Sequence, residues 1–372
     1  MPKQEIFEAS VRYFLQPIVP FLDDPQVTEI MVNGPFQVYV ERNGRLEATD
    51  ARFPSEDALR AAVHNISQWV GREITEERPV LDARLPDGSR VHAIIPPSAR
   101  TGTYLTIRKF AGHALTLADF VRLGSMSEVA REFLELCVLL RKNILISGGS
   151  GSGKTSLLGA LARVIPPNER IIVIEDTSEI RLPQPHCLFL EAQRPAATGR
   201  GGLTVRQLFT NSLRMRPDRV IVGEVRGGEA LDMIQSMLTG HSGSLSTVHA
   251  SSPRDALVRL EILSLMSDVD IPVYVARAQV ASAIHLVVQL SRFPEDGSRK
   301  VSRITEVCGL DKDQRYELRD LFVLKGLGKD SKGRIRAQLD PTGTKPTFAH
   351  EIRDQGLTDK VRLTAALWGL PE

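Results

Sequence analysis

The chain has 372 residues, of which 42% are hydrophobic and 25% are charged. These proportions are typical of a folded protein and exclude a disordered or low-complexity chain, and the length predicts two to three domains. Lys and Arg total 47 against 45 Asp and Glu, so the net charge of +2 gives no general electrostatic reason to bind nucleic acid.

We expect no transmembrane helix, because the longest apolar stretches, such as 284–290, fall short of the roughly 20 residues that span a bilayer. The first ten residues, MPKQEIFEAS, hold early acidic residues and no apolar core, so we expect no secretory signal and a cytoplasmic location. The cysteines are too few and too scattered for a disulfide framework or a CxxC zinc site. We interpret them as core thiols: Cys137, Cys187 and Cys308.

Residues 1 to about 110 combine short strand-like runs with one helical stretch at 55–70, which predicts a small α/β domain. The strands are expected at 29–32, 37–40, 91–95 and 104–107. Hairpin turns are predicted at Asn33-Gly34, Asn43-Gly44 and Asp87-Gly88. Residues 111–130 lack strong periodicity, and we predict that they link this domain to a second one.

The second domain, 131–372, alternates buried strands with helices, which predicts an α/β fold with a mostly parallel sheet. Near-continuous Val, Ile and Leu runs of this kind are typical of strands covered on both faces. They lie at 143–147, 170–176, 219–225, 244–249 and 283–289. A C-terminal extension from about residue 300 adds strand candidates at 303–307 and 316–324.

A phosphate-binding loop follows the first of these strands. The pattern GxxxxGK[ST] is matched by Gly148, Gly149, Ser150, Gly151, Ser152, Gly153, Lys154 and Thr155, with Ser156 next in the helix. Glycines let the backbone N–H groups point at a polyphosphate, and the helix N-terminus adds positive dipole character. We therefore expect ATP as cofactor, with Lys154 at the β- and γ-phosphates and the Thr155 hydroxyl on Mg²⁺.

Carboxylates for the metal and the attacking water should lie at the carboxyl ends of the strands. The run RIIVIEDTSEI ends in Glu175 and Asp176, with Glu179 a few residues on. The run VIVGE ends in Glu224, which we predict to be the Walker-B-like carboxylate that holds Mg²⁺ directly or through water. The alternative is that each is a solvated loop acid.

The segment GHSGSLSTVHA places His241 and His249 on either side of a Gly/Ser turn and a strand. A single histidine is more often structural. Because Ser246, Thr247 and His249 end a strand of the predicted sheet, we favour a γ-phosphate sensor, with His241 also at the nucleotide. Metal binding here lacks further ligands.

Four segments together resemble one family. The segments GGSGSGKT, IEDTSEI, MRPDRVIVGEVRGGEALDMIQSMLTGH and GHSGSLSTVHA are similar, in order and spacing, to the ATPases of type II and type IV secretion and of type IV pili. The segments VTEIMVNGPFQVYVERNGRL and RPVLDARLPDGSRVHAIIPP resemble the tight-adherence (Tad, Flp) pilus branch. Nearly the whole chain takes part, and about the last fifty residues match loosely.

The resemblance implies a hexameric ring of two-domain subunits, each with a PAS-like N-terminal domain that closes over ATP on a RecA-like core. It implies a motor at the cytoplasmic face of the inner membrane, where such ATPases engage polytopic platform proteins and drive pilin assembly or protein export. Three scattered cysteines cannot build the tetracysteine zinc module of some members, so the chain fits the shorter branch.

Catalytic roles carried over from the family fall on named positions. Glu175 is the leading candidate to activate water and Glu179 the second, while Glu224 takes the Walker B place. Arginines of the N-terminal domain carry positive charge toward the γ-phosphate, which can be worth roughly 10³ to 10⁵ in rate. The matching positions are Arg90 and Arg108, with Arg100 as a third candidate; the alternative is that these are surface arginines.

Two other functions are weighed against the motor. A RecA-like nucleic-acid motor, such as a helicase or a conjugative DNA pump, is disfavoured by the near-neutral charge and the 5% aromatic content, because such tracks need basic grooves and stacking residues. We therefore expect no specific nucleic acid as partner. A non-hydrolysing nucleotide sensor is disfavoured by the intact lysine, threonine and acidic residues.

Overall fold

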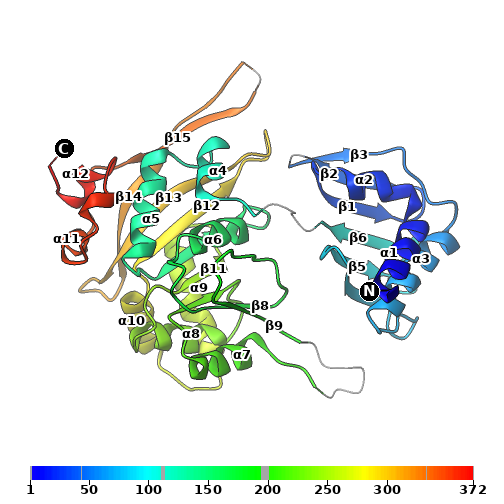
Figure 1. Cartoon of the computed structure of the whole chain (residues 1–372), viewed down its shortest axis with the longest axis horizontal. Coiled ribbons are helices and arrows are strands. Elements are labelled where there is room, and N and C mark those ends of the chain that lie inside the picture. The colour runs from blue at the N-terminus through cyan, green and yellow to red at the C-terminus, as the bar shows by residue number, and fades with distance from the viewer. Residues whose placement is uncertain (1, 43, 110–113, 194–200, 332, 372) are drawn as a thin grey trace. The chain divides into compact units, whose positions relative to one another are not determined.

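The computed structural model describes residues 2–42, 44–109, 114–193, 201–331 and 333–371 (Figure 1). The chain divides into two compact units, Met1–His113 and Ala114–Glu372. Each unit contains one sheet and its own hydrophobic core.

The first unit is an antiparallel sheet of order β3-β2-β1-β6-β5-β4. Its strands are β1 (Val27–Asn33), β2 (Val38–Arg42), β3 (Arg45–Ala48), β4 (Val80–Arg84), β5 (Arg90–Ile94) and β6 (Tyr104–Arg108). Its helices are α1 (Pro2–Phe14), η1 (Gln16–Ile18), α2 (Val19–Asp23) and α3 (Glu56–Trp69). Alternate residues of the central strands are buried with one side of α3, so the opposite face of the sheet carries the polar residues.

The local signals explain most of this unit. Ser55 caps α3 by accepting the N–H of Ala58. The turns predicted at Asn33-Gly34 and Asp87-Gly88 each join an antiparallel pair, β1 with β2 and β4 with β5. Asn43 lies outside the described residues. The strands β3 and β4 were missing from the prediction, because RLEA is wholly exposed and VLDAR has little apolar alternation.

The second unit is a mixed sheet of order β15-β14-β13-β12-β7-β11-β10-β8-β9. From β12 to β9 the neighbours are parallel, while β13, β14 and β15 are added antiparallel. The strands are β7 (Ile144–Gly148), β8 (Ile171–Glu175), β9 (Cys187–Glu191), β10 (Arg219–Val222), β11 (Leu245–His249), β12 (Leu286–Arg292), β13 (Arg299–Leu310), β14 (Tyr316–Lys329) and β15 (Ile335–Pro341). The α/β fold class is confirmed, with an antiparallel N-terminal sheet.

Helices cover both faces of this sheet (Figure 1). They are α4 (Leu117–Arg122), α5 (Glu128–Leu139), α6 (Lys154–Ala162), α7 (Val205–Ser212), η2 (Leu213–Met215), α8 (Glu229–Leu238), α9 (Pro253–Leu265), α10 (Val273–Ala283), α11 (Glu351–Asp354), η3 (Thr358–Lys360) and α12 (Ala365–Trp368). In β7, Ile144 and Ile146 face the core under α4 to α6, whereas Leu145 faces the core under α7 to α10. Apolar residues on both faces explain why these strands read as continuous apolar runs.

The predicted linker is wrong over most of its length. Thr116 and Asp119 form a capping box that starts α4, and α5 begins at Glu128, so the stretch from 114 onward belongs to the second unit. Residues 110–113 lie outside the described residues. The weak periodicity of 114–130 reflects one short helix, α4, and the turn that leads into α5.

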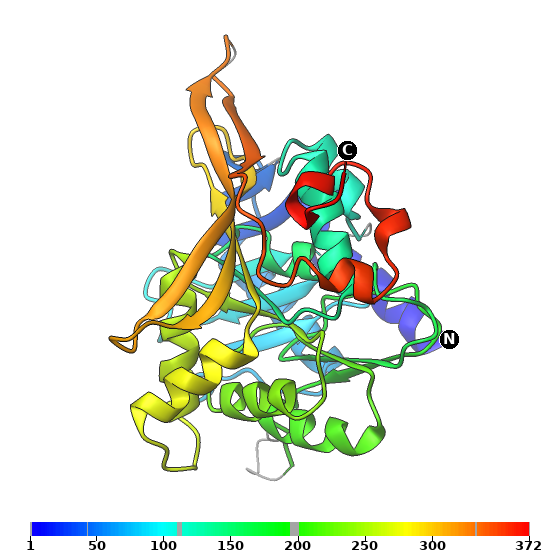
Figure 2. The same cartoon turned by 90° about the vertical axis from the view of Figure 1, so that its left-hand side faces the viewer.

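The C-terminal extension is larger than predicted. Strands β14 and β15 form a long hairpin whose turn end projects from the rest of the second unit (Figure 2). The chain then returns to α5, where the carboxylate of Glu132 accepts the backbone N–H groups of Arg362, Leu363 and Thr364. Ring contacts of Trp368 with Phe133 close this segment onto the core.

The three cysteines are free thiols, and only one of them fits the predicted core position. Cys137 is fully buried, whereas Cys187 and Cys308 are half-buried, so the interpretation of all three as core thiols is wrong for two of them. Burial raises the pKa of the Cys308 thiol to about 11. Within the described ranges, no helix is both long and apolar enough to cross a bilayer.

Candidate active site

The loop between β7 and α6 has the backbone that the phosphate-binding pattern predicts. Gly151 has φ 66° and Gly153 has φ 94°, conformations that glycine adopts without steric cost. A Cβ on Gly148 would lie 2.5 Å from the Ser152 Oγ and 2.8 Å from the carbonyl oxygen of Leu290. The loop can therefore keep this tight curve only with glycines at these positions.

Donors converge inside the loop on the carbonyl oxygen of Gly149. It accepts from the Lys154 Nζ at 2.9 Å, from the Ser152 Oγ at 2.9 Å and from the Ser152 N–H at 3.4 Å. Lys154 is buried, with 7% of its surface exposed, and Thr155 and Ser156 occupy the first turn of α6. A concave loop with a buried ammonium and a helix N-terminus fits a polyphosphate.

The parallel register brings the other predicted residues to the same edge of the sheet. His249 pairs with Gly148 across β11 and β7, and β10 ends beside β11 just before Glu224. Next comes β8, whose last residue is Glu175. Because the carboxyl ends of parallel strands meet at one edge, residues more than 100 positions apart in the chain gather there.

An ordered row of ionisable side chains runs along this edge. The Lys154 Nζ lies 3.3 Å from the His249 Nε2, which lies 3.2 Å from the Glu224 Oε1. The Arg226 guanidinium donates to the Glu224 Oε2 at 2.8 Å and lies 3.6 Å from the Asp176 carboxylate. Sequence reasoning missed Arg226, although its spacing two residues after Glu224 in a turn was a usable signal.

The environment sets the charges in this chain of residues. Burial and the adjacent Lys154 lower the pKa of His249, so its imidazole is neutral at pH 7. Burial alone would raise the pKa of Glu224, but the hydrogen bond from Arg226 and the surrounding positive charges outweigh it and lower the pKa. Glu224 is therefore an ionised acceptor at neutral pH, and His249 can donate to it.

Glu175 is buried, and its carboxylate faces its own loop. It accepts the N–H of Glu179 at 3.0 Å and the N–H of Ile180 at 3.2 Å. Gly223 makes room for it, because a Cβ there would lie 2.8 Å from the Glu175 Cγ. Glu179 follows on this loop, beyond the end of β8.

The structure does not bring His241 to the loop. It precedes β11, at the amino end of the strand, whereas His249 ends that strand beside Gly148. The structure therefore does not bring the predicted nucleotide contact of His241 to the loop 148–155. Its Nδ1 is buried without a hydrogen-bond partner among the described residues. Their positions on either side of a Gly/Ser turn could not reveal which end of the strand each histidine is near.

In the first unit, two predicted arginines are direct neighbours. Arg90 on β5 pairs with Arg108 on β6, and on its other side it pairs with Arg84 on β4. Directly opposed residues share one face of a sheet, so the three form an arginine row on the face away from the core. Arg84 was missed, although it mirrors Arg90 about the Asp87-Gly88 turn. Arg100 lies in the exposed turn before β6, outside this row.

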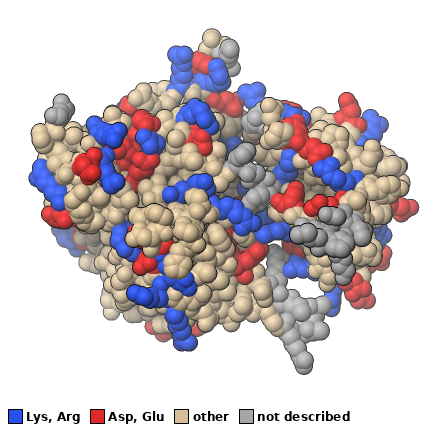
Figure 3. All heavy atoms as spheres, in the orientation of Figure 1, with Lys and Arg blue, Asp and Glu red and all other residues tan. Residues whose placement is uncertain are grey.

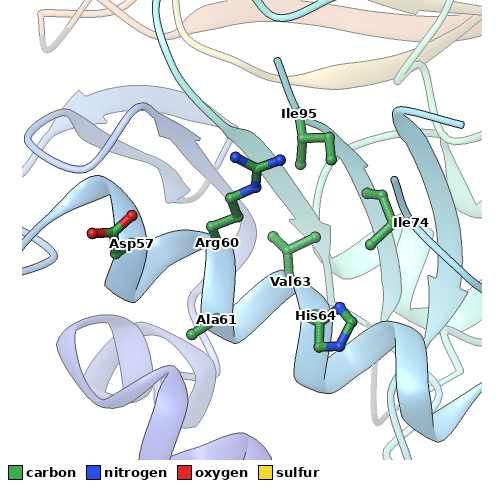
Figure 4. Close-up of a pocket in the computed structure, with 7 residues that line it drawn as sticks. All are labelled: Asp57, Arg60, Ala61, Val63, His64, Ile74 and Ile95. Atoms are coloured by element: carbon green, nitrogen blue, oxygen red, sulfur yellow. The ribbon is translucent and has the colours of Figure 1, made fainter. Parts of the chain in front are cut away.

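A separate pocket of about 290 Å³ lies within the first unit (Figure 4). One wall is α3, with Arg60 and His64, and apolar side chains of Ile74 and Ile95 lie opposite. None of the predicted site residues lines it. The residues that the phosphate-binding pattern predicts therefore lie outside this pocket.

A phosphate-binding loop, an ionised acid and a neutral histidine at the carboxyl edge of a parallel sheet define a P-loop nucleotide-hydrolysing domain. The family model described as "Type II/IV secretion system protein" matches residues 14–319. The chain therefore belongs to this family of secretion and pilus ATPases, and ATP hydrolysis is its activity.

Individual relatives agree with this assignment. A putative conjugal transfer protein of Mycobacterium tuberculosis is 34% identical over 291 residues, covering 77% of this chain and 82% of the relative. The type IV secretion system protein PtlH of Bordetella pertussis is 35% identical over 317 residues, covering 79% of this chain and 94% of the relative. The crystal structure of the pilus retraction motor PilT with bound ADP has the same fold, with a TM-score of 0.55, 18% identity, and coverage of 83% of this chain and 82% of that chain.

Proposed function

We propose that this ATPase is a hexameric motor at the cytoplasmic face of the inner membrane that powers a type IV secretion or pilus machine through membrane platform proteins. The observation that carries the catalytic part is the convergence of the loop 148–155, Glu224 and His249 on one edge of the sheet. The type IV secretion and conjugal transfer names of the relatives support the machine class.

The finer assignment to tight-adherence pilus assembly rests on the N-terminal segments VTEIMVNGPFQVYVERNGRL and RPVLDARLPDGSRVHAIIPP alone. The relatives compared above carry type IV secretion and conjugal transfer names. Co-purification of the protein with its membrane partners, followed by their identification, tests the assignment. Pilin-assembly platform proteins are the expected partners, and conjugation proteins would contradict it.

The loop and its neighbours would hold ATP with Mg²⁺. The inward N–H groups and Lys154 would bind the β- and γ-phosphates, and the Thr155 hydroxyl and Glu224 would hold the metal, which supplies charge neutralisation on the phosphates. His249, neutral and placed between Lys154 and Glu224, would report the presence of the γ-phosphate by donating its Nε2–H to Glu224 while its Nδ1 accepts from the Lys154 Nζ, 3.5 Å away. Glu175 would accept a proton from the attacking water, with Glu179 as second candidate.

The arginine row Arg84, Arg90 and Arg108 would supply positive charge to the γ-phosphate when the first unit closes over the nucleotide, with Arg100 as a further candidate. Hydrolysis would then depend on domain closure, which is how such a motor converts chemistry into movement.

Sedimentation analysis with and without ATP tests the proposed hexameric ring, and a monomer under all conditions would contradict it.

The Lys154→Ala variant tests the site. Removing the ammonium leaves the phosphates without their buried counter-charge, so we expect at least a 100-fold loss of ATP turnover, in the range found when a preorganised group that stabilises transition-state charge is removed. The measurement is phosphate release under saturating ATP, with Lys325→Ala on the projecting hairpin as the control. Turnover at the wild-type rate in Lys154→Ala would overturn the site assignment.

The nucleic-acid motor remains the competing function. On the face shown in Figure 3, Lys and Arg side chains are interspersed with Asp and Glu, rather than gathered into one basic track. Mixed charge of this kind offers little counterion release to a phosphate backbone. Steep, salt-dependent stimulation of turnover by DNA would favour this alternative over the proposed motor.

A further inference from the structure

The β12–β13 hairpin lies against the phosphate-binding loop, although 130 or more residues separate them in the chain. Three loop glycines touch it. A Cβ built on Gly148 would lie 2.8 Å from the Leu290 carbonyl oxygen. A Cβ built on Gly151 would lie 3.0 Å from an Arg292 guanidinium nitrogen. A Cβ built on Gly153 would lie 3.7 Å from the Arg299 Cδ. The hairpin is therefore one wall of the loop.

One hydrogen bond fixes the orientation of the loop against this wall. The Arg299 Nε donates to the carbonyl oxygen of Gly151 at 2.7 Å. Within one trans peptide unit the carbonyl and the N–H point in opposite directions, so holding the Gly151 carbonyl outward turns the Ser152 N–H inward. That N–H indeed points at the Gly149 carbonyl, where the Lys154 ammonium also converges.

We propose that Arg299 is a positioning residue for ATP binding, which acts by holding the Gly151–Ser152 peptide so that its N–H faces the phosphates. This inference rests on the proposed role of the loop. The sequence motifs end at residue 250, so nothing in the P-loop, acidic or histidine segments points to Arg299, the first residue of β13.

The hairpin turn is itself held from the C-terminal extension. Asp296 accepts the Ser298 N–H at 2.9 Å and the Ile335 N–H of β15 at 2.7 Å. Residue 335 lies beyond the part of the chain that matches the family model. The extension thus supports the wall from which Arg299 reaches the loop.

Two substitutions separate a hydrogen-bonding role from a charge role. Arg299→Gln keeps an N–H donor at the same number of bonds from the backbone as the Arg Nε, but removes the charge. Arg299→Met keeps a side chain that reaches as far as the Arg Nε position but has no donor there. In Arg299→Met we expect the affinity for a fluorescent ADP analogue to fall and KM for ATP to rise, each about 10-fold, with kcat within about 2-fold of wild type. In Arg299→Gln we expect the affinity, KM and kcat all to stay within about 2-fold of wild type.

A measurement without nucleotide reads the loop directly. Hydrogen–deuterium exchange of the peptide covering 148–153 should be faster in Arg299→Met than in wild type and unchanged in Arg299→Gln. Arg303→Met, which removes an arginine of β13 that pairs with Asp320, is the matched control and should alter neither binding nor exchange. Melting temperatures of the nucleotide-free variants identify any general loss of folding.

Equal defects in Arg299→Gln and Arg299→Met would overturn the proposal, because charge and not the donated hydrogen bond would then be what matters. Wild-type binding and exchange in Arg299→Met would overturn it as well. The Lys154→Ala variant, measured in parallel, keeps the two questions apart. If Lys154→Ala retains turnover, the site itself is wrong; if it is inactive while Arg299→Met behaves as wild type, only the role of Arg299 is wrong.

Discussion

Glu175 and Glu179 compete for one role, and their surroundings differ. The Glu175 carboxylate is buried and binds two backbone N–H groups of the loop that carries Glu179. Because a carboxylate can accept more than two hydrogen bonds, it can bind these N–H groups and still take a proton from water as a general base. The Glu175 side chain lies close to the end of β10, because Gly223 has no Cβ to fill the space beside it.

Matched glutamine substitutions test the two residues. In Glu175→Gln the amide oxygen can still accept the N–H groups of Glu179 and Ile180, so the loop should keep its conformation while the base is lost. We expect kcat to fall by about 10²- to 10⁴-fold in Glu175→Gln and by less than about 5-fold in Glu179→Gln, with ADP binding unchanged in both. Steady-state ATPase assays decide between them, and the reverse order of losses would reassign the base to Glu179.

At the scale of elements, one buried side chain joins three strands at the edge opposite the active site. The Asn143 side chain donates to the Ala283 carbonyl oxygen at 2.7 Å and accepts the Gly243 N–H at 2.8 Å, just before β12 and β11. Its own N–H donates to the His285 Nδ1 at 2.9 Å. These bonds fix the relative starts of β7, β11 and β12, and so help to set the parallel register that aligns the strand ends on the other side.

His285 makes this edge sensitive to acid. Burial, together with the nearby Lys142 charge, lowers the pKa of His285 to about 4, whereas an unfolded histidine titrates near ~6.5. As the pH falls through 6.5, the unfolded chain takes up a proton that the folded protein does not accept until about pH 4. The contribution of His285 to stability is therefore complete above pH 6.5 and is lost between pH 6.5 and 4.

The His285→Asn variant should remove this dependence, because the Asn Oδ1 can accept the Asn143 N–H and does not titrate. Between pH 7 and pH 4 we expect the free energy of unfolding of the wild type to fall by up to about 3 kcal/mol more than that of the variant. Urea titrations at several pH values measure it, with the exposed His350→Asn as control. Parallel pH profiles for wild type and His285→Asn would contradict the assignment.

At the scale of the whole molecule, each unit holds on its own sheet a set of positive groups that suit phosphate. The first unit presents the arginine row, and the second presents the phosphate-binding loop. If the first unit supplies charge to the γ-phosphate, loss of the arginines should slow hydrolysis without weakening the grip of the loop on ADP, which lacks that phosphate.

Alanine substitutions of the arginine row test this division of labour. We expect Arg90→Ala and Arg108→Ala to lower kcat by about 10³-fold, and Arg84→Ala by less, while the affinity for ADP stays within about 3-fold of wild type. Arg45→Ala, on the edge strand β3 of the same sheet, is the matched control. ATPase assays and ADP titrations measure both quantities, and an unchanged kcat in Arg90→Ala and Arg108→Ala would show that the row has no catalytic role.

Local sequence patterns were sufficient to predict a good part of the fold and of the candidate site. The loop 148–155 could be predicted because its glycines, lysine and threonine are contiguous and lie between a strand and a helix. The core strands could be predicted because burial on both faces requires unbroken apolar runs. The places of Glu175, at the end of β8, and of Glu224, two residues after β10, followed from those runs. The relatives confirm the family that the four segments indicated.

Contacts between distant segments could not be predicted, because hydrogen bonding and register depend on which strands become neighbours. The chain alone determined the phosphate-binding loop, the strand core and the family, since short-range steric and hydrophobic patterns encode them. Only the tertiary structure decided that His249 and not His241 reaches the loop, that Arg84 joins Arg90 and Arg108, and that Arg299 bonds Gly151. Each of these depends on a sheet pairing or a packed hairpin that no local pattern encodes.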